Sequence, residues 1–554
     1  MMFSIYKFIE AIFFRRSLKK KESNMTHNSV PQWVKEAFFY EIYPQSFCDS
    51  NGDGIGDIPG IISKLDYIKK LGCNAVWLNP CFESPFQDAG YDVADFYKVA
   101  PRYGCNDDLK NLFDEAHKRG IKVVLDLVAG HTSVEHPFFQ ASASKEKTPY
   151  DNFFVWTRGW QEDTGNYRFI SGLAERDGYF MVNFFACQPA LNYGFCPAEY
   201  PWQLDMDHPD AVAVQNELQN VMKFYLDMGC DGFRVDMASS LIKGSNAEYG
   251  INLLWKRYRN WLNENYPQAV LISEWCHPAA AIPAGFHIDF KAHFGEPGYS
   301  MLTRAEKELI NNSDLPAGLI SFFNESGKGD ARTFLAELSE EYKIIKNDGL
   351  FGIISGNHDM GRLRGNGRSD AMMKMIYAFL FSLPGVPFLY YGDEIGMDNT
   401  CGLGNKEGSY NRSAARTPMQ WDGSEKAGFS TADVEKFYLP VDSSKYNVES
   451  QEKDPDSLLN FVRSFLALKR SCKLLSNEAD FKVLYCESNQ VPAIFERCIG
   501  GEKMIVAVNP SNMDCQAEID ISADGFEVVL KQGEAAFSGN SISLGACSFA
   551  LWKK

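Results

Sequence analysis

Four apolar stretches of this 554-residue sequence end in residues whose side chains could do chemistry. A charge that ends a buried strand must be solvated, paired or functional, because burying an isolated charge is costly. The alternative to a functional site is that these charged residues are solvated at the strand ends or form structural salt bridges. The stretches are VVLDLVAGH (123–131), GFRVD (232–236), VLISE (270–274) and GIISGNHD (352–359), and their ionisable residues are Asp126, His131, Arg234, Asp236, Glu274, His358 and Asp359.

Several carboxylates that converge with an arginine and histidines suit the cleavage of glycosidic bonds. Cleavage with retention needs two carboxyl groups about 5–5.5 Å apart, one to attack the anomeric carbon and one to protonate the leaving oxygen. A neighbouring carboxylate raises the pKa of the acid. Arg234, two residues before Asp236, is placed to keep that carboxylate ionised. Spacing in the sequence does not give the distance between the two carboxyl groups.

These side chains meet only if the elements that carry them converge. From about residue 35, short apolar runs alternate with amphipathic stretches, which predicts a parallel sheet with helices outside it. About eight strands are expected, so the predicted fold class is α/β with a closed (β/α)8 barrel of the TIM type, whose strands all end on one face. The expected strands lie within residues 37–44, 74–80, 121–131, 230–236, 269–274, 286–294, 350–359 and 385–397, and the expected helices within 59–72, 107–120, 211–229, 247–265 and 456–471.

The alternation breaks in one long segment and changes near the end of the chain. Residues 132–205 are rich in aromatic residues, Gly, Asn and Pro without a sustained period, which favours an inserted subdomain after the third strand over a bare loop. Near the end, apolar and polar residues alternate, which predicts an antiparallel β domain. The predicted divisions are an N-terminal extension (1–34), the barrel (35–131 and 206–475), the inserted subdomain (132–205) and the C-terminal β domain (476–554).

Composition limits the partners and the compartment. The formal net charge is −17 with both signs interspersed, which argues against a nucleic acid or an anionic membrane and favours a small neutral oligosaccharide. Fourteen cysteines without a Cys-x-x-Cys pair are expected to be reduced thiols in a chain this long. No membrane span or cleavage site is expected, so we predict a cytoplasmic protein. The first 24 residues fit a weak amphipathic helix, a disordered extension or a segment upstream of a start at Met25, and the oligomeric state is open.

Eight motifs in order connect these residues to a known family. The sequence resembles the α-amylase superfamily of glycoside hydrolases from residue 35 to the C-terminus, and most of all its oligo-1,6-glucosidase, α-glucosidase and trehalose synthase branch. Each motif alone is a weak signal, but their combination is specific. The motifs are YEIYPQSFCDSNGDGIGD (40–57), GYDVADF (90–96), DLVAGHTS (126–133), QPALNY (188–193), GFRVD (232–236), SEW (273–275), GNHD (356–359) and RTPMQWD (416–422).

The resemblance implies roles for the catalytic residues. Asp236 takes the position of the family's nucleophile, and Arg234 that of the arginine that keeps it charged. Glu274 takes the position of the general acid/base. Asp359 corresponds to the carboxylate that binds sugar hydroxyls and distorts the ring, with His358 beside it.

The resemblance also implies residues that bind the terminal sugar. Tyr91 would stack under this sugar, and Asp92 would hydrogen-bond its far hydroxyls. His131 would contact the same sugar, while Asp126 would support the site. Arg412 lies where this branch has an arginine that pairs with the position of Asp92, although the surrounding NRSAARTP departs from the usual pattern.

The loop DSNGDGIGD resembles the first half of a calcium loop. Oxygen-bearing residues alternate, Gly54 suits the sharp turn, and Gly60 stands where an EF-hand would need glutamate, which rules out a full EF-hand. The alternative is a turn stabilised by Asx side chains without a metal. The resemblance implies a structural Ca2+ and no organic cofactor, and the implied ligands are Asp49, Asn51, Asp53, Ile55 and Asp57.

Three departures from the family leave the linkage preference open. Gly130 replaces the usual asparagine, which removes one supporting amide, and Ala190 replaces the usual aspartate. In the family, valine directly after the nucleophile tends to accompany α-1,6 preference, and alanine or threonine tends to accompany α-1,4 preference. This chain has Met237 there, which matches neither, and its long side chain could narrow the +1 region.

We therefore expect a retaining, exo-acting α-glucosidase that hydrolyses α-linked gluco-oligosaccharides through a covalent glycosyl-enzyme intermediate, with some transglycosylation. The first alternative is a trehalose- or sucrose-isomerising transglucosidase, which runs the same intermediate but keeps water out. A non-catalytic, transporter-associated homologue is a further alternative, and the presence of all three carboxylates speaks against it.

Overall fold

The computed structural model describes residues 30–171, 174–291, 297–304, 320–365, 367–441 and 446–554. The described chain therefore begins inside the predicted N-terminal extension, most of which lies outside these residues. It opens with a short helix, α2 (Gln32–Lys35).

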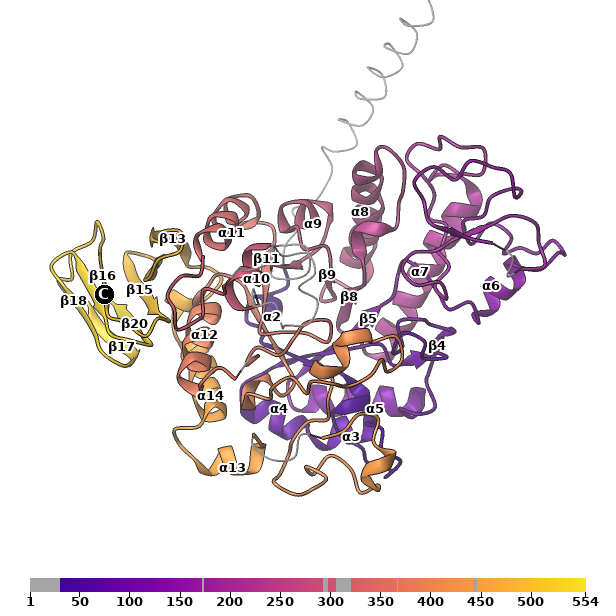
Figure 1. The fold of residues 1–554 in the computed structure, drawn as a ribbon. Coiled ribbons are helices and arrows are strands. Elements are labelled where there is room, and N and C mark those ends of the chain that lie inside the picture. The colour runs from indigo at the N-terminus through magenta and orange to yellow at the C-terminus, as the bar shows by residue number, and fades with distance from the viewer. Residues whose placement is uncertain (1–29, 172–173, 292–296, 305–319, 366, 442–445) are drawn as a thin grey trace, which may run out of the picture.

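Eight parallel strands form a closed barrel, as the sequence predicts (Figure 1). Each predicted strand range contains one of them. Around the barrel they follow the order β1-β12-β11-β10-β9-β8-β5-β2. They are β1 (Phe39–Ile42), β2 (Ala75–Leu78), β5 (Lys122–Leu127), β8 (Gly232–Val235), β9 (Val270–Ser273), β10 (Ile288–Phe290), β11 (Leu350–Ile354) and β12 (Val386–Tyr390).

Large rings fill the barrel interior. The ring of Trp77 stacks on Phe290 at 5.4 Å, and Phe290 meets Phe388 edge to face at 5.0 Å. Such aromatic pairs stabilise the fold beyond the burial of their surface area. The barrel interior is a packed core, and the residues that could do chemistry lie at the ends of the strands.

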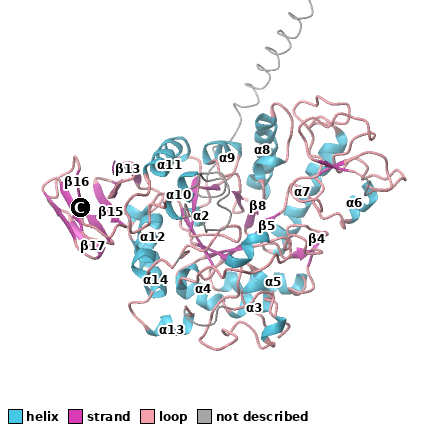
Figure 2. Cartoon of the chain, in the orientation of Figure 1, coloured by secondary structure: helices cyan, strands magenta, loops and turns pink. Residues whose placement is uncertain are grey.

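Helices cover the outside of the barrel (Figure 2). The helix predicted within 59–72 is in fact two helices, because at Lys64 the backbone turns more tightly and its N–H donates to the carbonyl of Ile61. The other predicted helices are single. In chain order the helices after α2 that bear on the barrel and its flanks are α3 (Ile58–Ser63), α4 (Leu65–Leu71), α5 (Asn106–Lys118), α7 (Pro209–Met228), α8 (Ala247–Asn265), α9 (Pro278–Ala284), α10 (Pro297–Thr303), α11 (Arg332–Ile345), α12 (Asp370–Ser382), α13 (Val448–Lys453) and α14 (Leu458–Ser471).

The segment between β5 and α7 forms a small unit of its own. It contains α6 (Pro137–Ser142) and the short hairpin of β6 (Phe169–Ile170) and β7 (Phe180–Met181). A separate cluster of buried side chains holds it together, formed by Val155, Met181, Ala190, Phe195 and Trp202. This unit is the predicted inserted subdomain, and a bridge between His131 and Ala190 joins it to the end of β5.

The C-terminal part is an antiparallel β domain, as predicted. One sheet has the order β13-β14-β15-β20-β17 and the other β16-β19-β18. The domain packs on the barrel through Phe379 and Phe495, whose rings lie 5.6 Å apart. The strands are β13 (Asp480–Tyr485), β14 (Ala493–Ile499), β15 (Glu502–Asn509), β16 (Cys515–Glu518), β17 (Glu527–Gln532), β18 (Ala535–Ser538), β19 (Ser541–Leu544) and β20 (Ser548–Lys553).

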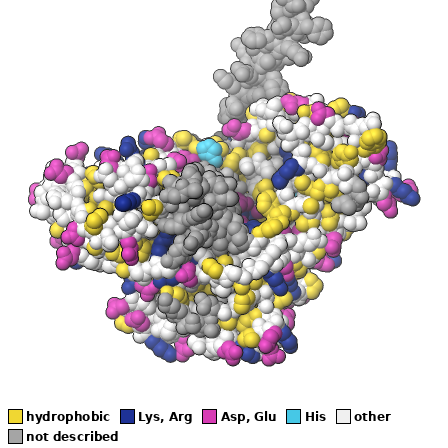
Figure 3. Space-filling model, in the orientation of Figure 1, with side chains coloured by type: hydrophobic (Ala, Val, Ile, Leu, Met, Phe, Trp, Pro, Cys, Tyr) yellow, Lys and Arg dark blue, Asp and Glu magenta, His cyan; other side chains and the backbone are white. Residues whose placement is uncertain are grey.

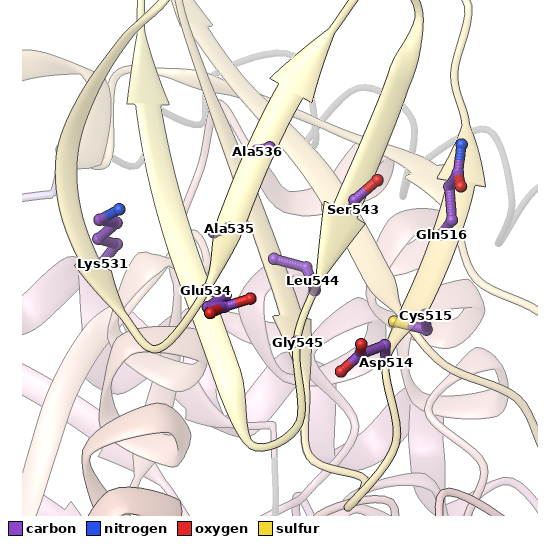
Figure 4. Close-up of a pocket in the computed structure, with 10 residues that line it drawn as sticks. All are labelled: Asp514, Cys515, Gln516, Lys531, Glu534, Ala535, Ala536, Ser543, Leu544 and Gly545. Carbon is purple, nitrogen blue, oxygen red and sulfur yellow. The ribbon is translucent and has the colours of Figure 1, made fainter.

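A hollow of about 660 Å³ lies in this C-terminal domain (Figure 4). Its lining is mostly short, including Ala535, Ala536, Ser543 and Gly545, and the lining residues contain no aromatic ring. None of the predicted site residues lines it. The hollow therefore offers no stacking platform for a sugar.

The surface and the cysteines agree with the composition. Acidic and basic side chains are interspersed over the face shown in Figure 3. All fourteen cysteines lie in the described part of the chain, and all are free thiols there. Among the described residues, every helix is too short or too polar to cross a membrane.

Candidate active site

Asp236 and Glu274 lie side by side at the carboxyl ends of two neighbouring strands. β8 pairs with β9 in a register that sets Val235 opposite Ser273, so the residue after each strand reaches the same face. The backbone N–H of Glu274 donates to the carbonyl of Val235 at 3.0 Å. Local topology alone thus brings together two carboxyl groups that are 38 positions apart in the sequence.

One buried guanidinium joins the carboxylates. Arg234 Nη1 lies 2.8 Å from Asp126 Oδ1 and 3.1 Å from Asp236 Oδ1, and its Nη2 lies 2.8 Å from Glu274 Oε2. Charge-assisted hydrogen bonds of this kind are the strong ones. Arg234, which the sequence analysis places next to Asp236, is therefore in contact with it.

Asp236 and Glu274 interact directly with each other. Burial raises the pKa of Asp236 well above its usual value, and the adjacent Glu274 raises it further against the charge of Arg234. A hydrogen bond also joins the two carboxyl groups. Two acids that interact this closely titrate as a pair. A pair with one charge and one proton can supply both a nucleophile and an acid.

Met237 holds Glu274 through its backbone. Its φ is 44°, in the left-handed region that a long side chain rarely adopts. In this conformation the Met237 N–H donates to Glu274 Oε2 at 2.9 Å. Such strain costs about 1–3 kcal/mol and persists where the surrounding structure fixes it. The turn after β8 thereby positions the predicted acid.

Asp359 is surrounded by cations. Arg412 Nη1 contacts Asp359 Oδ1, Arg416 Nη2 lies 3.0 Å from the same oxygen, and His358 Nε2 lies 3.1 Å from Oδ2. Burial alone would raise the pKa of Asp359, but His358 and the two arginines hold it well below its usual value. Asp359 is thus an ionised hydrogen-bond acceptor at any ordinary pH.

Glu41, which the sequence analysis missed, holds His358. Glu41 lies on β1 and is fully buried, and its Oε1 is 2.8 Å from His358 Nδ1. Burial lowers the pKa of His358, but Asp359 and Glu41 outweigh burial and raise it to about 9. The ring is therefore an imidazolium at pH 7. A charged residue within the buried strand of YEIYP was the signal that could have found Glu41.

Tyr91 packs against His358. The two rings are nearly parallel with centroids 5.3 Å apart, and the Tyr91 hydroxyl is 2.7 Å from His358 Nε2 and 2.9 Å from Asp126 Oδ2. Asp126 therefore supports both Tyr91 and Arg234. The structure brings Asp126, Tyr91, Arg234, Asp236, Glu274, His358 and Asp359 into one network.

Arg412 pairs with Asp88, and the predicted pairing with Asp92 is wrong. Asp92 is fully buried and accepts bonds from Ser84 Oγ and from the N–H groups of Gln87 and Asp88, at 2.8–3.0 Å. Both of its carboxylate oxygens are thus engaged by its own loop.

Asp88 makes the pairing with Arg412 that was predicted for Asp92. Its Oδ1 lies 3.5 Å from Arg412 Nη2, and Gln188 Nε2 donates to its Oδ2 at 2.8 Å. Burial raises the pKa of Asp88 to about 6, against the pull of Arg412. Arg412 therefore bridges Asp88 and Asp359. The signal for Asp88 was a second carboxylate three residues before Tyr91.

His131 is buried beside Tyr91. Its Nε2 is 3.0 Å from the carbonyl of Tyr91, and its Nδ1 is 3.1 Å from Asn183 Nδ2. Burial lowers the pKa of His131 to about 4, so the ring is neutral at pH 7. Both nitrogens of this neutral ring are thus bonded to the protein itself.

The 49–57 loop is folded by its own side chains. Asp49 accepts bonds from three backbone N–H groups, of residues 51, 52 and 54, and Asp57 caps α3 through the N–H of Gly60 at 2.6 Å. The donor types suit calcium, but in the described chain no three His, Cys, Asp or Glu side chains gather closely enough to hold a metal. This geometry matches the Asx-turn alternative, and calcium binding stays a prediction.

Three aromatic rings connect the inserted subdomain to the segment that carries Arg412. Phe184 and Phe185 lie 4.4 Å apart, and Phe185 lies 5.5 Å from Tyr410, which begins η4 (Tyr410–Ala415). Tyr410 is 57% exposed and Phe184 is 42% exposed. We call these three rings the aromatic bridge. Neighbours of the bridge residues in sequence, Asn183 and Arg412, contact the site itself.

Comparison with known proteins agrees with this geometry. Residues 41–478 match the family model described as the alpha amylase catalytic domain. The chain therefore belongs to the α-amylase family of glycoside hydrolases.

The relatives found are glucoside-processing enzymes. The chain is 34% identical over 490 residues to the trehalose synthase/amylase TreS of Mycolicibacterium smegmatis, covering 79% of this chain and 76% of that protein. It is 31% identical over 535 residues to an oligo-1,6-glucosidase of Parageobacillus thermoglucosidasius, covering 86% and 90%. In fold it is similar to the trehalulose synthase MutB of Pseudomonas mesoacidophila, with a TM-score of 0.78, 24% identity and 95% and 100% coverage.

Proposed function

We propose that this enzyme transfers an α-glucosyl unit from a short α-linked oligosaccharide, with retention, to water or to another sugar hydroxyl. The observation that carries the proposal is the contact of one guanidinium, that of Arg234, with both Asp236 and Glu274. A retaining mechanism needs one ionised and one protonated carboxyl group on either side of the scissile bond.

Two displacements account for the reaction. Asp236 attacks the anomeric carbon and forms a glycosyl ester, while Glu274 gives its proton to the leaving glycosidic oxygen. Glu274, now ionised, then removes the proton from the acceptor hydroxyl, which attacks the same carbon and releases Asp236. Arg234 contacts both carboxylates, so it is placed to stabilise whichever of them bears the charge.

The groups behind the reacting carboxylates support an exo-acting pocket. Asp359 and Asp88 are linked by Arg412, and both are buried and suited to accept hydrogen bonds from sugar hydroxyls. His131 and Tyr91 complete this group. Polar groups that converge behind a single ring favour a terminal glucosyl unit over the interior of a long chain.

The aromatic bridge supports isomerisation as a second candidate function. It joins the inserted subdomain to the segment of Arg412, and a bridge placed there would hold the released sugar and exclude water. The same intermediate would then return its glucosyl unit to the released sugar through another hydroxyl. The trehalose synthase relatives accord with this candidate.

Product analysis separates the two candidates. Incubation with maltose yields only glucose and short transfer products if water is the main acceptor. Trehalose without an equivalent amount of glucose would identify an isomerase. In either case Asp236→Asn should lose activity on 4-nitrophenyl α-glucoside by about 10³-fold or more with an unchanged circular dichroism spectrum. Substantial residual activity in a preparation free of wild-type enzyme would refute the proposed nucleophile.

We also propose a cytoplasmic compartment. The free state of all fourteen thiols supports it, because reducing compartments keep cysteines unpaired. Fractionation of the producing cells tests this proposal.

A further inference from the structure

Gly130 leaves a space that a side chain from the inserted subdomain fills. A Cβ built on Gly130 would lie 2.5 Å from Asn183 Nδ2 and 3.2 Å from Ser240 Oγ. The backbone of Gly130 does not adopt a left-handed conformation, so its φ and ψ do not demand glycine. A side chain at position 130 would have to displace the amide of Asn183, which occupies its space.

The backbone of Asn183 is fixed on both sides. Asn183 lies two residues after the end of β7, and its N–H donates to the carbonyl of Gln188 at 3.0 Å. Its own carbonyl accepts a bond from Arg168 Nη2 at 3.1 Å. The residue is 7% exposed, so its side chain is held inside the protein.

The amide of Asn183 contacts groups in the segments that follow two barrel strands. Its Nδ2 is 3.1 Å from His131 Nδ1, at the end of β5, and 3.4 Å from Ser240 Oγ, beyond β8. It also lies 3.7 Å from Met237 Sδ. Met237 is the residue whose backbone N–H holds Glu274.

These contacts determine how His131 is protonated. An amide NH2 can only donate, so Nδ1 of His131 must accept, and the ring proton resides on Nε2. From there it is donated to the carbonyl of Tyr91 at 3.0 Å. One tautomer and one ring orientation of His131 are thus selected from both sides.

We propose that Asn183 is a positioning residue for the reaction: from the inserted subdomain it supplies the amide that this chain lacks at position 130, fixes the tautomer of His131 and supports the Met237 turn. The inference rests on the proposed function, because His131 and Glu274 act on the sugar in that proposal. It makes the inserted subdomain part of the catalytic framework of this enzyme, since its folding sets the geometry at the ends of β5 and β8.

Exchanging the two residues tests this proposal directly. Asn183→Gly should lower kcat for maltose at least tenfold, because it removes the amide and leaves a space. Gly130→Asn alone should also lower kcat, since the new side chain collides with Asn183. The double variant Gly130→Asn/Asn183→Gly returns an amide to the same space from the other side and should recover at least part of the lost kcat. Asn166→Ala, at an exposed asparagine of the same subdomain, is the matched control.

A second variant provides a readout that simple destabilisation would not give. Asn183→Asp keeps the shape but places a carboxylate at His131 Nδ1, which favours the imidazolium. The acid limb of the pH profile of kcat/KM should then move to higher pH, while the melting temperature stays near that of the wild type. An unshifted profile, or a double variant no more active than the weaker single variant, would overturn the proposal.

The wild-type measurement separates this inference from the function on which it rests. Inactivity of the wild type on both maltose and 4-nitrophenyl α-glucoside would count against the proposed function. An active wild type whose activity and pH profile are unchanged by the Asn183 substitutions would overturn only the role of Asn183.

Discussion

Glu41→Gln is the substitution that most directly probes the electrostatics of the site. Glu41 is buried on β1 with its Oε1 2.8 Å from His358 Nδ1, and glutamine has nearly the same shape without the charge. The variant should therefore keep the barrel intact and change the proton affinity of His358.

The magnitude follows from what surrounds His358. Burial lowers the pKa of this ring, while Asp359 and then Glu41 raise it to about 9. Because Asp359 is the larger of the two contributions and stays in place, removing Glu41 should lower the pKa of His358 by about 1, which corresponds to about 1.4 kcal/mol. The ring would still be largely protonated near pH 7.

Two measurements check this expectation. The titration of the His358 ring, followed by NMR, should move to lower pH by about one unit in Glu41→Gln. The raised pKa of His358 contributes to the stability of the wild-type fold. This contribution is complete below pH 6.5 and is lost as pH rises through about 9. The free energy of unfolding should therefore fall less steeply in that window for the variant than for the wild type.

Glu36→Gln is the matched control, because Glu36 is exposed and has no histidine partner in the described chain. It should change neither the titration of His358 nor the pH dependence of stability. The reasoning fails if Glu41→Gln folds normally and its His358 ring titrates at the same pH as that of the wild type.

Three further predictions concern the acid, the aromatic bridge and the calcium loop. Glu274→Gln should lower kcat/KM on maltose by at least 100-fold more than on an aryl glucoside with a good leaving group, and equal losses on both would contradict the acid role. Tyr410→Ala should raise the ratio of hydrolysis to transfer about threefold or more. The control is Trp160→Ala, at an exposed ring of the inserted subdomain. An unchanged ratio in Tyr410→Ala would count against the aromatic bridge as a barrier to water. If calcium binds the 49–57 loop, the melting temperature should be higher in 1 mM Ca2+ than in a chelator, and Asp53→Asn should abolish this difference. Identical melting temperatures in the two conditions would favour the Asx turn without a metal.

The barrel could be predicted from the sequence because its strands are short, apolar and separated by amphipathic helices. The break at Lys64 could not, since apolar residues continue at helical spacing through Ile62 and Leu65 while the backbone turns. A pattern of side chains does not report a change in backbone hydrogen bonding.

The site could be predicted in part for a similar reason. Asp236 and Glu274 each end a strand, so topology alone brings them together. Asp88 and Asp92 both lie in one loop, and only the direction of their side chains decides which one meets Arg412. The loss of an amide at Gly130 was visible in the sequence, but its replacement by Asn183, 53 residues away, depends on how the inserted subdomain folds back.

The most direct test of the account is to trap the covalent intermediate. A fluorinated glucosyl fluoride that reacts quickly and turns over slowly should inactivate the enzyme, and peptide mass spectrometry should find one fluoroglucosyl group esterified to Asp236. A label on Glu274 or Asp359, or turnover with inversion and no trapped ester, would contradict the mechanism.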